Sequence, residues 1–303
     1  MHVIHPKYKC IDWIDTEKLD WDELCFEPKA INLLIDNPDR INWVYLSHNP
    51  AAIDILMENK DKINWTGFSE NPLGIDLLKQ NVDRIHWDYL CENPNAEELF
   101  YSNPDKVNFY IVSSNPGALN FIKENMMYIN WSSICENENA IDIIKENSSL
   151  IDYFYLSVNK NALDIISKNL DKINWPRLCS NINPDIVKIL SDNLNKICWP
   201  NLSENPVAID ILNANQDKIH WAIFSANPAG IDLLYKNQDK IDWTYLSSNP
   251  SIFKLDYDYY YTNMNKVGEL GISLKEELIR RVFHPTRLVY YLEKYDYDIN
   301  EEF

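Results

Sequence analysis

An aromatic residue recurs in register along most of the chain, at intervals of 22 residues. The column consists of Trp21, Trp43, Trp65, Trp87, Phe109, Trp131, Tyr153, Trp175, Trp199, Trp221 and Trp243. One interval departs from the period, because Trp175 and Trp199 are 24 residues apart. Units this short bury their apolar faces only against neighbouring units. The period therefore predicts a stacked-repeat protein and not a domain with one central core.

Each repeat contains a strong helix-start signal. In the repeat that begins at Trp43, Asn49 is suited to be an N-cap and Pro50 to occupy the first helical position. Apolar residues at helical spacing follow, which predicts the longer helix of the unit. An asparagine sixteen residues after the aromatic, Asn59 here, ends the pattern. We expect it to adopt the left-handed conformation of helix ends, with a buried asparagine ladder between repeats as the competing account.

A second segment begins at an aspartate that precedes Lys or Arg, such as Asp39 before Arg40. Its apolar residues are not at clean helical spacing, so a short α-helix, a 3-10 turn and a brief strand all fit. We favour a helix with Asp39 as its N-cap. The unit also resembles leucine-rich-variant repeats, in which an α-helix alternates with a 3-10 helix.

These signals predict an all-α fold, an α-solenoid. About ten to eleven 22-residue units, each helix–turn–helix or α/3-10, would form a right-handed superhelix. We expect an N-terminal cap over 1–20, the repeat solenoid over 21–253 and a C-terminal helical cap over 254–303, where Ser273 begins a capping box.

Four of the six cysteines occupy one position, four residues after the aromatic, where the other repeats have serine. They are Cys25, Cys91, Cys135 and Cys179. These cysteines are two or three repeats apart in sequence, and stacked helices ~8–10 Å apart keep them beyond disulfide reach. The column predicts a small buried residue and neither a disulfide nor a zinc site.

The net charge of −18 and the pI near 4.7 argue against binding to nucleic-acid phosphates or an anionic membrane. A basic protein surface is the better electrostatic match. Nucleic-acid binding remains a minor alternative through a ridge of basic residues, most of which directly follow an aspartate. The ridge consists of Arg40, Lys62, Arg84, Lys106, Lys172, Lys196, Lys218 and Lys240.

No pattern for catalysis stands out from the repeat. The chain has six glycines and no glycine-rich phosphate loop, and its serines and carboxylates are largely periodic. His86 and His220 replace the asparagine before the tryptophan and are repeat variants. We therefore expect no enzyme activity, no cofactor and no metal site.

Candidate partner-binding positions lie between the periodic columns, one, two, fourteen and fifteen residues after the aromatic. Two inserted residues after Trp175 also enlarge one turn, and insertions in repeat proteins often lie on a binding face, although structural drift is a competing explanation. The candidates are Val44, Tyr45, Met57, Glu58, Asp88, Tyr89, Asn181, Ile182 and Asn183.

The unit Ile-Asn-Trp-x-x-Leu-Ser-x-Asn-Pro-x-Ala-Ile-Asp-Leu-Leu is similar to a tandem repeat found in many paralogous proteins of giant DNA viruses that infect amoebae. The segments around His5-Pro6-Lys7 and Phe283-His284-Pro285 resemble the ends of such proteins. The resemblance implies a location in the host cytoplasm or viral factory, or in the virion. It identifies no functional residues.

The leading hypothesis is a non-enzymatic scaffold that binds a viral or host protein. The alternative is a self-associating structural component of the virion or viral factory, and the oligomeric state stays open. The start of the chain lacks the apolar run of a signal peptide and no stretch has the ~20 apolar residues of a membrane span, so we expect a protein that is neither secreted nor membrane-bound.

Overall fold

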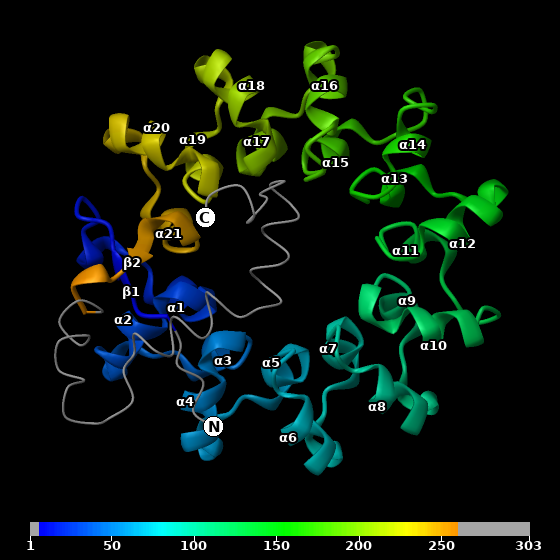
Figure 1. Cartoon of the computed structure of the whole chain (residues 1–303), viewed down its shortest axis with the longest axis horizontal. Helices are drawn as coiled ribbons and strands as arrows, with labels where there is room; N and C mark the ends of the chain where they lie inside the picture. Colours follow the sequence, from blue (N-terminus) through cyan, green and yellow to red (C-terminus); the bar gives the residue numbers. More distant parts are fainter. Residues whose placement is uncertain (1–5, 260–303) are drawn as a thin grey trace, which may run out of the picture. The chain divides into compact units, whose positions relative to one another are not determined.

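The computed structural model describes residues 6–259 (Figure 1). The chain divides into two units, Met1–Lys254 and Leu255–Phe303, and nearly all of the described residues belong to the first. The capping box predicted at Ser273 lies outside the described residues.

Each complete repeat contains two short α-helices, separated by 3-10 helices or by turns. In the repeat that begins at Trp43, the order is α3 (Trp43–Leu46), η4 (Pro50–Ala52), α4 (Ile53–Glu58) and η5 (Lys60–Lys62). The predicted all-α repeat architecture is therefore confirmed, and the α/3-10 alternative describes the unit best.

The helices fall into two sets. Those that begin at the column aromatic are α1 (Trp21–Phe26), α3, α5 (Trp65–Glu70), α7 (Trp87–Glu92), α9 (Phe109–Val112), α11 (Trp131–Ile134), α13 (Tyr153–Leu156), α15 (Trp175–Cys179), α17 (Trp199–Glu204), α19 (Trp221–Phe224) and α21 (Trp243–Ser247). The others are α2 (Ile31–Ile35), α4, α6 (Ile75–Gln80), α8 (Glu97–Ser102), α10 (Leu119–Glu124), α12 (Ile141–Glu146), α14 (Leu163–Ile166), α16 (Ile186–Ser191), α18 (Ile209–Ala214) and α20 (Ile231–Lys236). Two short strands, β1 (Tyr8–Cys10) and β2 (Phe253–Leu255), pair with each other. Within the first unit, the aromatic-start helices form an inner row and the others an outer row (Figure 1).

Most aromatic-start helices are capped by the side chain of the residue that precedes the aromatic, and α7 and α17 lack this cap. Asn42 Oδ1 accepts a hydrogen bond from Val44 N at 3.1 Å. Asp39 instead lies inside the 3-10 helix η3 (Pro38–Arg40), and Ile41 is extended between η3 and α3. The prediction that Asp39 is the N-cap of a short α-helix is wrong, because Asp39 lies inside η3 and the extended Ile41 separates η3 from α3.

The asparagine that follows most outer-row helices has a negative φ. Asn59 has φ −126° and ψ 51°, and its Nδ2 donates to Ile55 O at 2.9 Å. The predicted left-handed conformation is wrong here, because the amide satisfies a carbonyl of the last turn without it. This bond lies within one helix, so the column does not form a ladder between repeats either.

The asparagine of the Asn-Pro pair links the repeats instead. Asn71 is fully buried, and its Oδ1 accepts from Leu73 N at 3.0 Å, as predicted for an N-cap. Its Nδ2 donates to Ser47 O and Asn49 O of the preceding repeat at 3.2 and 3.0 Å. Equivalent amide bonds recur from Asn49 to Asn249 and form an asparagine ladder through the core.

The serine–cysteine column adds a second link between repeats. Ser47 Oγ donates to Trp43 O at 2.7 Å and accepts from Asn64 N of the next repeat at 2.9 Å. Where cysteine replaces serine, Cys25 Sγ accepts from Asn42 N at 3.4 Å. The predicted small buried residue is present, but its role as a hydrogen-bond link was not predicted.

The first repeat contacts the last through two of the contacts that join interior neighbours. Asp20 N donates to Ser247 Oγ at 2.7 Å, and Lys18 Nζ lies 5.0 Å from the ring centroid of Trp243. Ile11 N donates to Ile252 O at 2.8 Å beside the paired strands.

We call these contacts, between residues 8–29 and 235–254, the seam. The 3-10 helix η1 (Thr16–Lys18) takes the place that η3 has between interior repeats, so one repeat is assembled from both ends of the first unit. The array of repeats in this unit therefore closes on itself.

Candidate interaction surface

Four of the predicted contact residues lie on the inner row. Val44 and Tyr45 belong to α3, and Asp88 and Tyr89 belong to α7 (Figure 1). The side chains of Val44 and Tyr89 are 48% and 37% exposed, which is high for large apolar residues. These positions face solvent because Leu46 and its equivalents point into the core instead.

Two further candidates, Met57 and Glu58, end α4 in the outer row. Met57 is 38% exposed. The candidate positions one and two residues after the aromatic therefore lie on one row of helices, and those fourteen and fifteen residues after it lie on the other.

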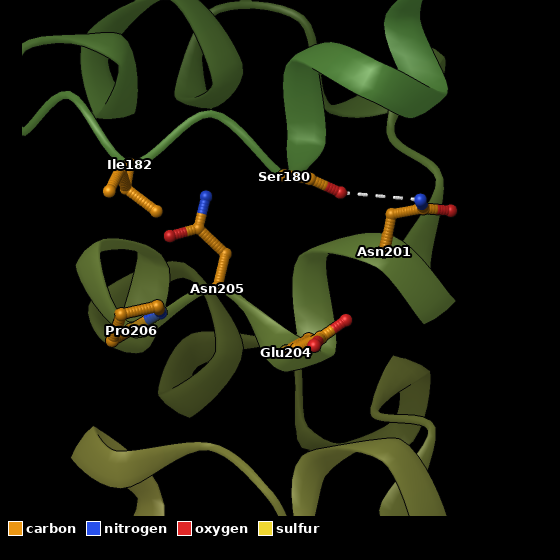
Figure 2. Close-up of a pocket in the computed structure, with 6 residues that line it drawn as sticks. All are labelled: Ser180, Ile182, Asn201, Glu204, Asn205 and Pro206. Carbon is orange, nitrogen blue, oxygen red and sulfur yellow. Dashed lines mark hydrogen bonds between the residues drawn. The ribbon is translucent and has the colours of Figure 1, made fainter. Parts of the chain in front are cut away.

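The remaining candidates lie at the two-residue insertion, beside a pocket of about 240 Å³. Figure 2 shows its lining, which consists of Ser180, Ile182, Asn201, Glu204, Asn205 and Pro206. Ile182 is exposed at its rim, whereas Asn181 is buried and donates to Ser157 O at 3.0 Å as part of the asparagine ladder. The Asn183 amide donates to Lys160 O at 2.6 Å. Only Ile182 of the three presents a side chain to this pocket.

A wider pocket of about 640 Å³ is lined by residues between 145 and 169. Its lining includes Tyr153, which takes the place of the tryptophan of most repeats, and the lysines Lys145 and Lys168. Tyr153 Oη donates to Asn169 Oδ1 at 3.1 Å. No described feature of this pocket selects a ligand.

Aromatic side chains of neighbouring inner-row helices touch one another. The Phe26 ring lies 4.9 Å from that of Tyr45 and 5.4 Å from the His48 imidazole, centroid to centroid. The Tyr89 ring lies 6.2 Å from His48 and 4.9 Å from His86. We call these five residues the aromatic row. Gly67 lies under His48, where a Cβ would meet the imidazole, so this glycine lets the ring lie flat across the repeat.

Two carboxylates border the aromatic row. Glu70 Oε2 lies 3.1 Å from His48 Nδ1. Burial raises the pKa of Glu92 above its ordinary value, and the nearby charge of Glu70 raises it further. Since the two carboxylates repel each other, a cation at this place would relieve an unfavourable interaction.

Further along the same row, the chain supplies such a cation itself. The Arg177 guanidinium lies 4.6 Å from the ring centroid of Phe154 and 5.4 Å from that of Tyr155. It also forms an ion pair with Glu136. Tyr155 Oη is hydrogen-bonded to Tyr110 Oη at 3.2 Å, which connects this cluster to the preceding repeats.

Seven of the eight residues of the basic ridge considered for nucleic acid stack on the aromatic column, and Lys218 pairs with Asp217 instead. Arg40 lies 4.6 Å from the Trp21 ring centroid, Lys62 lies 4.4 Å from that of Trp43, and Lys240 lies 4.2 Å from that of Trp221. The same contact recurs at Arg84, Lys106, Lys172 and Lys196. These cations are therefore part of the packing between repeats, which the sequence pattern alone did not reveal.

The buried cysteines of the serine–cysteine column have pKa values raised by burial. Burial raises the pKa of Cys91 and of Cys179 to about 11, and the Sγ of Cys179 accepts a hydrogen bond from Cys198 N at 3.3 Å. Among residues 6–259, no group of three or more His, Cys, Asp or Glu side chains is placed to hold a metal ion. No helix in that range is long and apolar enough to cross a membrane.

Comparison with protein-family models, with curated proteins and with solved structures found no match to this chain. A function for the chain therefore has to be inferred from its repeat geometry and its inner-row surface.

Proposed function

We propose that the protein is a non-enzymatic repeat scaffold that binds another protein through the inner row of helices. The observation that carries the proposal is the aromatic row, whose partly exposed rings extend from α1 to α7, with His48 lying across Gly67 towards Tyr89. Contiguous exposed apolar surface is typical of protein interaction sites, and Tyr and Arg are enriched at their energetic centres.

The repeat architecture supports this proposal. The asparagine ladder and the serine–cysteine links hold the helices in fixed register, so the side chains between those columns are preorganised for a partner. Tyr110, Phe154 and Tyr245 extend the exposed aromatic surface to later repeats of the same row.

The location and partner origin are part of the same proposal. The sequence resemblance supports a role in the host cytoplasm or the viral factory of a giant virus, or in the virion. The right-handed superhelix, the two helical caps and their boundaries stay predictions; a closed array would limit any superhelix to one turn.

Affinity purification tests the scaffold. The tagged full chain would be recovered from the cells that make it, beside Tyr89→Ser/Tyr110→Ser/Tyr245→Ser on the inner row and Ile35→Ser/Met57→Ser/Tyr101→Ser on the outer row. We expect a stoichiometric polypeptide with the wild type and the outer-row variant, and its loss with the inner-row variant. Equal recovery with all three, or no partner at low salt, would reject the proposal.

Self-association is the second candidate, because an exposed aromatic surface can also pair with a second copy. Sedimentation velocity separates the two. A strictly monomeric species at high concentration contradicts self-association and leaves the scaffold in place.

A further inference from the structure

The Arg177 cluster shows how this repeat binds a cation. A carboxylate five residues after one aromatic (Glu136), a ring in the next repeat (Tyr155) and a guanidinium in the repeat after that (Arg177) come together. The stacked ring and the ion pair each favour a guanidinium, which is planar and weakly hydrated.

The same carboxylate and ring positions recur three repeats earlier without the cation. Residues 66 positions before Glu136, Tyr155 and Arg177 are Glu70, Tyr89 and Ile111. Glu70 contacts His48, whose ring is 6.2 Å from that of Tyr89, so carboxylate and ring lie in one cluster. The apolar Ile111 stands where the arginine would be.

A second incomplete copy lies one repeat further along. Residues 44 positions before Glu136, Phe154 and Arg177 are Glu92, Tyr110 and Ser133. Tyr110 is 54% exposed. Among the described residues, no basic side chain pairs with Glu92, and its charge is opposed by that of Glu70.

We propose that Glu70 with Tyr89, and Glu92 with Tyr110, form two neighbouring subsites that bind arginine side chains of a basic segment of the partner protein. This inference rests on the proposed function and names the chemistry of its partner. The net charge of −18 favours the approach of a cationic segment over that of an acidic one.

The spacing of the subsites restricts the segment. Packed helices of adjacent repeats are ~8–10 Å apart. A segment in the polyproline II conformation advances ~9 Å in three residues and presents every third side chain on the same side. Two arginines separated by two residues therefore fit the two subsites.

The test measures the fluorescence anisotropy of a labelled Arg-Ala-Ala-Arg peptide on titration with the full chain. The comparison peptides carry one arginine, or glutamine in both places. We expect the two-arginine peptide to bind most tightly and the glutamine peptide to bind least. Equal binding of all three would overturn the proposal.

Matched variants assign the binding to the subsites. Glu70→Gln/Glu92→Gln should weaken the two-arginine peptide by about tenfold, because two charge-assisted contacts become neutral. Glu124→Gln/Glu146→Gln changes the net charge equally on the outer row and should alter affinity by less than about twofold. An equal fall in both pairs would mean general charge attraction and would reject the subsites.

Ile111→Arg gives a third check, since it supplies the missing cation internally. We expect the new arginine to stack on Tyr89 and pair with Glu70, which lowers the two-arginine affinity towards that of the one-arginine peptide. Unchanged affinity in a folded Ile111→Arg variant, verified by circular dichroism, would contradict the assignment.

If a partner is captured through the inner row but these peptides are not distinguished, the scaffold proposal stands and the arginine subsites fall. If the peptides bind as expected but no protein is captured, the arginine subsites stand and the scaffold proposal falls.

Discussion

The seam and an interior interface, such as the one between the repeats at Trp43 and Trp65, use the same two contacts. In each, a serine hydroxyl accepts a hydrogen bond from a backbone N–H: Ser247 accepts from Asp20 at the seam, and Ser47 accepts from Asn64 inside the array. Each also stacks a cation on the column aromatic, Lys18 on Trp243 at the seam. The shared contacts show that closure obeys the packing rules of the repeat itself.

The two interfaces differ at the asparagine ladder. At the seam the ladder position holds Glu27, which is buried but has no N–H to donate. Lys29 Nζ donates to Pro250 O at 3.1 Å, and the paired strands β1 and β2 replace an outer-row helix. The seam therefore lacks the most repeated link of the interior and compensates with local contacts.

The largest expected effect is the loss of an interior ladder residue. Asn115→Ala removes two amide bonds, to Cys91 O and Asn93 O, together with an N-cap. We expect a loss of about 3 kcal/mol in the free energy of unfolding. Asn59→Ala, which removes one bond within a helix, should cost about 1 kcal/mol. Equal losses in urea denaturation would refute the distinction between the two asparagine columns.

The serine link compares the seam with the interior directly. Ser247→Ala and Ser69→Ala each remove an acceptor for a backbone N–H, that of Asp20 or of His86. We expect each substitution to lower the free energy of unfolding by about 1–2 kcal/mol, since the hydrogen bond from the backbone N–H to the serine hydroxyl is the same at both places. Hydrogen exchange at Asp20 N should also accelerate in Ser247→Ala alone. A cost near zero at Ser247 would mean that the seam is open in solution.

A smaller, stabilising effect is expected when the ladder is completed at the seam. In Glu27→Asn, the amide would donate to Ser247 O and Asn249 O by the register of the other repeats, which should add about 1 kcal/mol. A variant less stable than wild type at neutral pH would contradict this register.

Glu27 also predicts a pH dependence. Burial raises the pKa of the Glu27 carboxyl above its ordinary value. The contribution of Glu27 to the free energy of unfolding is therefore fullest at acidic pH and is lost as pH rises through the folded-state pKa. Urea titrations from acidic to neutral pH should show this loss in the wild type but not in Glu27→Asn. If the free energy of unfolding falls with pH equally in Glu27→Asn and in the wild type, the pH dependence would belong to other carboxyls, such as Glu23.

The sequence predicted the repeat and the Asn-Pro cap because both depend on local chemistry that each unit repeats. It failed at Asp39 and at Asn59, where several capping geometries suit the same residue type and only the neighbouring backbone decides between them. The serine column was identified as small, but its hydrogen bond joins residues of two repeats and has no local signature.

The sequence pattern of a single repeat could not predict closure of the array either, since closure depends on the angle between successive repeats summed over the array. A signal was nevertheless present. Residues 17–20, Glu-Lys-Leu-Asp, lie one period before residues 39–42, Asp-Arg-Ile-Asn, and match them in residue type. The inner-row cation sites needed the structure, because their members come from three consecutive repeats.

The most direct test of closure is zero-length cross-linking of the monomer with a carbodiimide, which joins an amine and a carboxylate already in contact. Lys254 Nζ lies 2.7 Å from Asp12 Oδ1 across the seam, and both side chains are accessible. We predict a cross-linked peptide joining Lys254 to Asp12 in monomeric protein, absent in Asp12→Asn, with the Lys79–Glu98 ion pair as the interior control. Cross-linking of the control pair without the Lys254–Asp12 product, or that product only in dimers, would contradict a closed array.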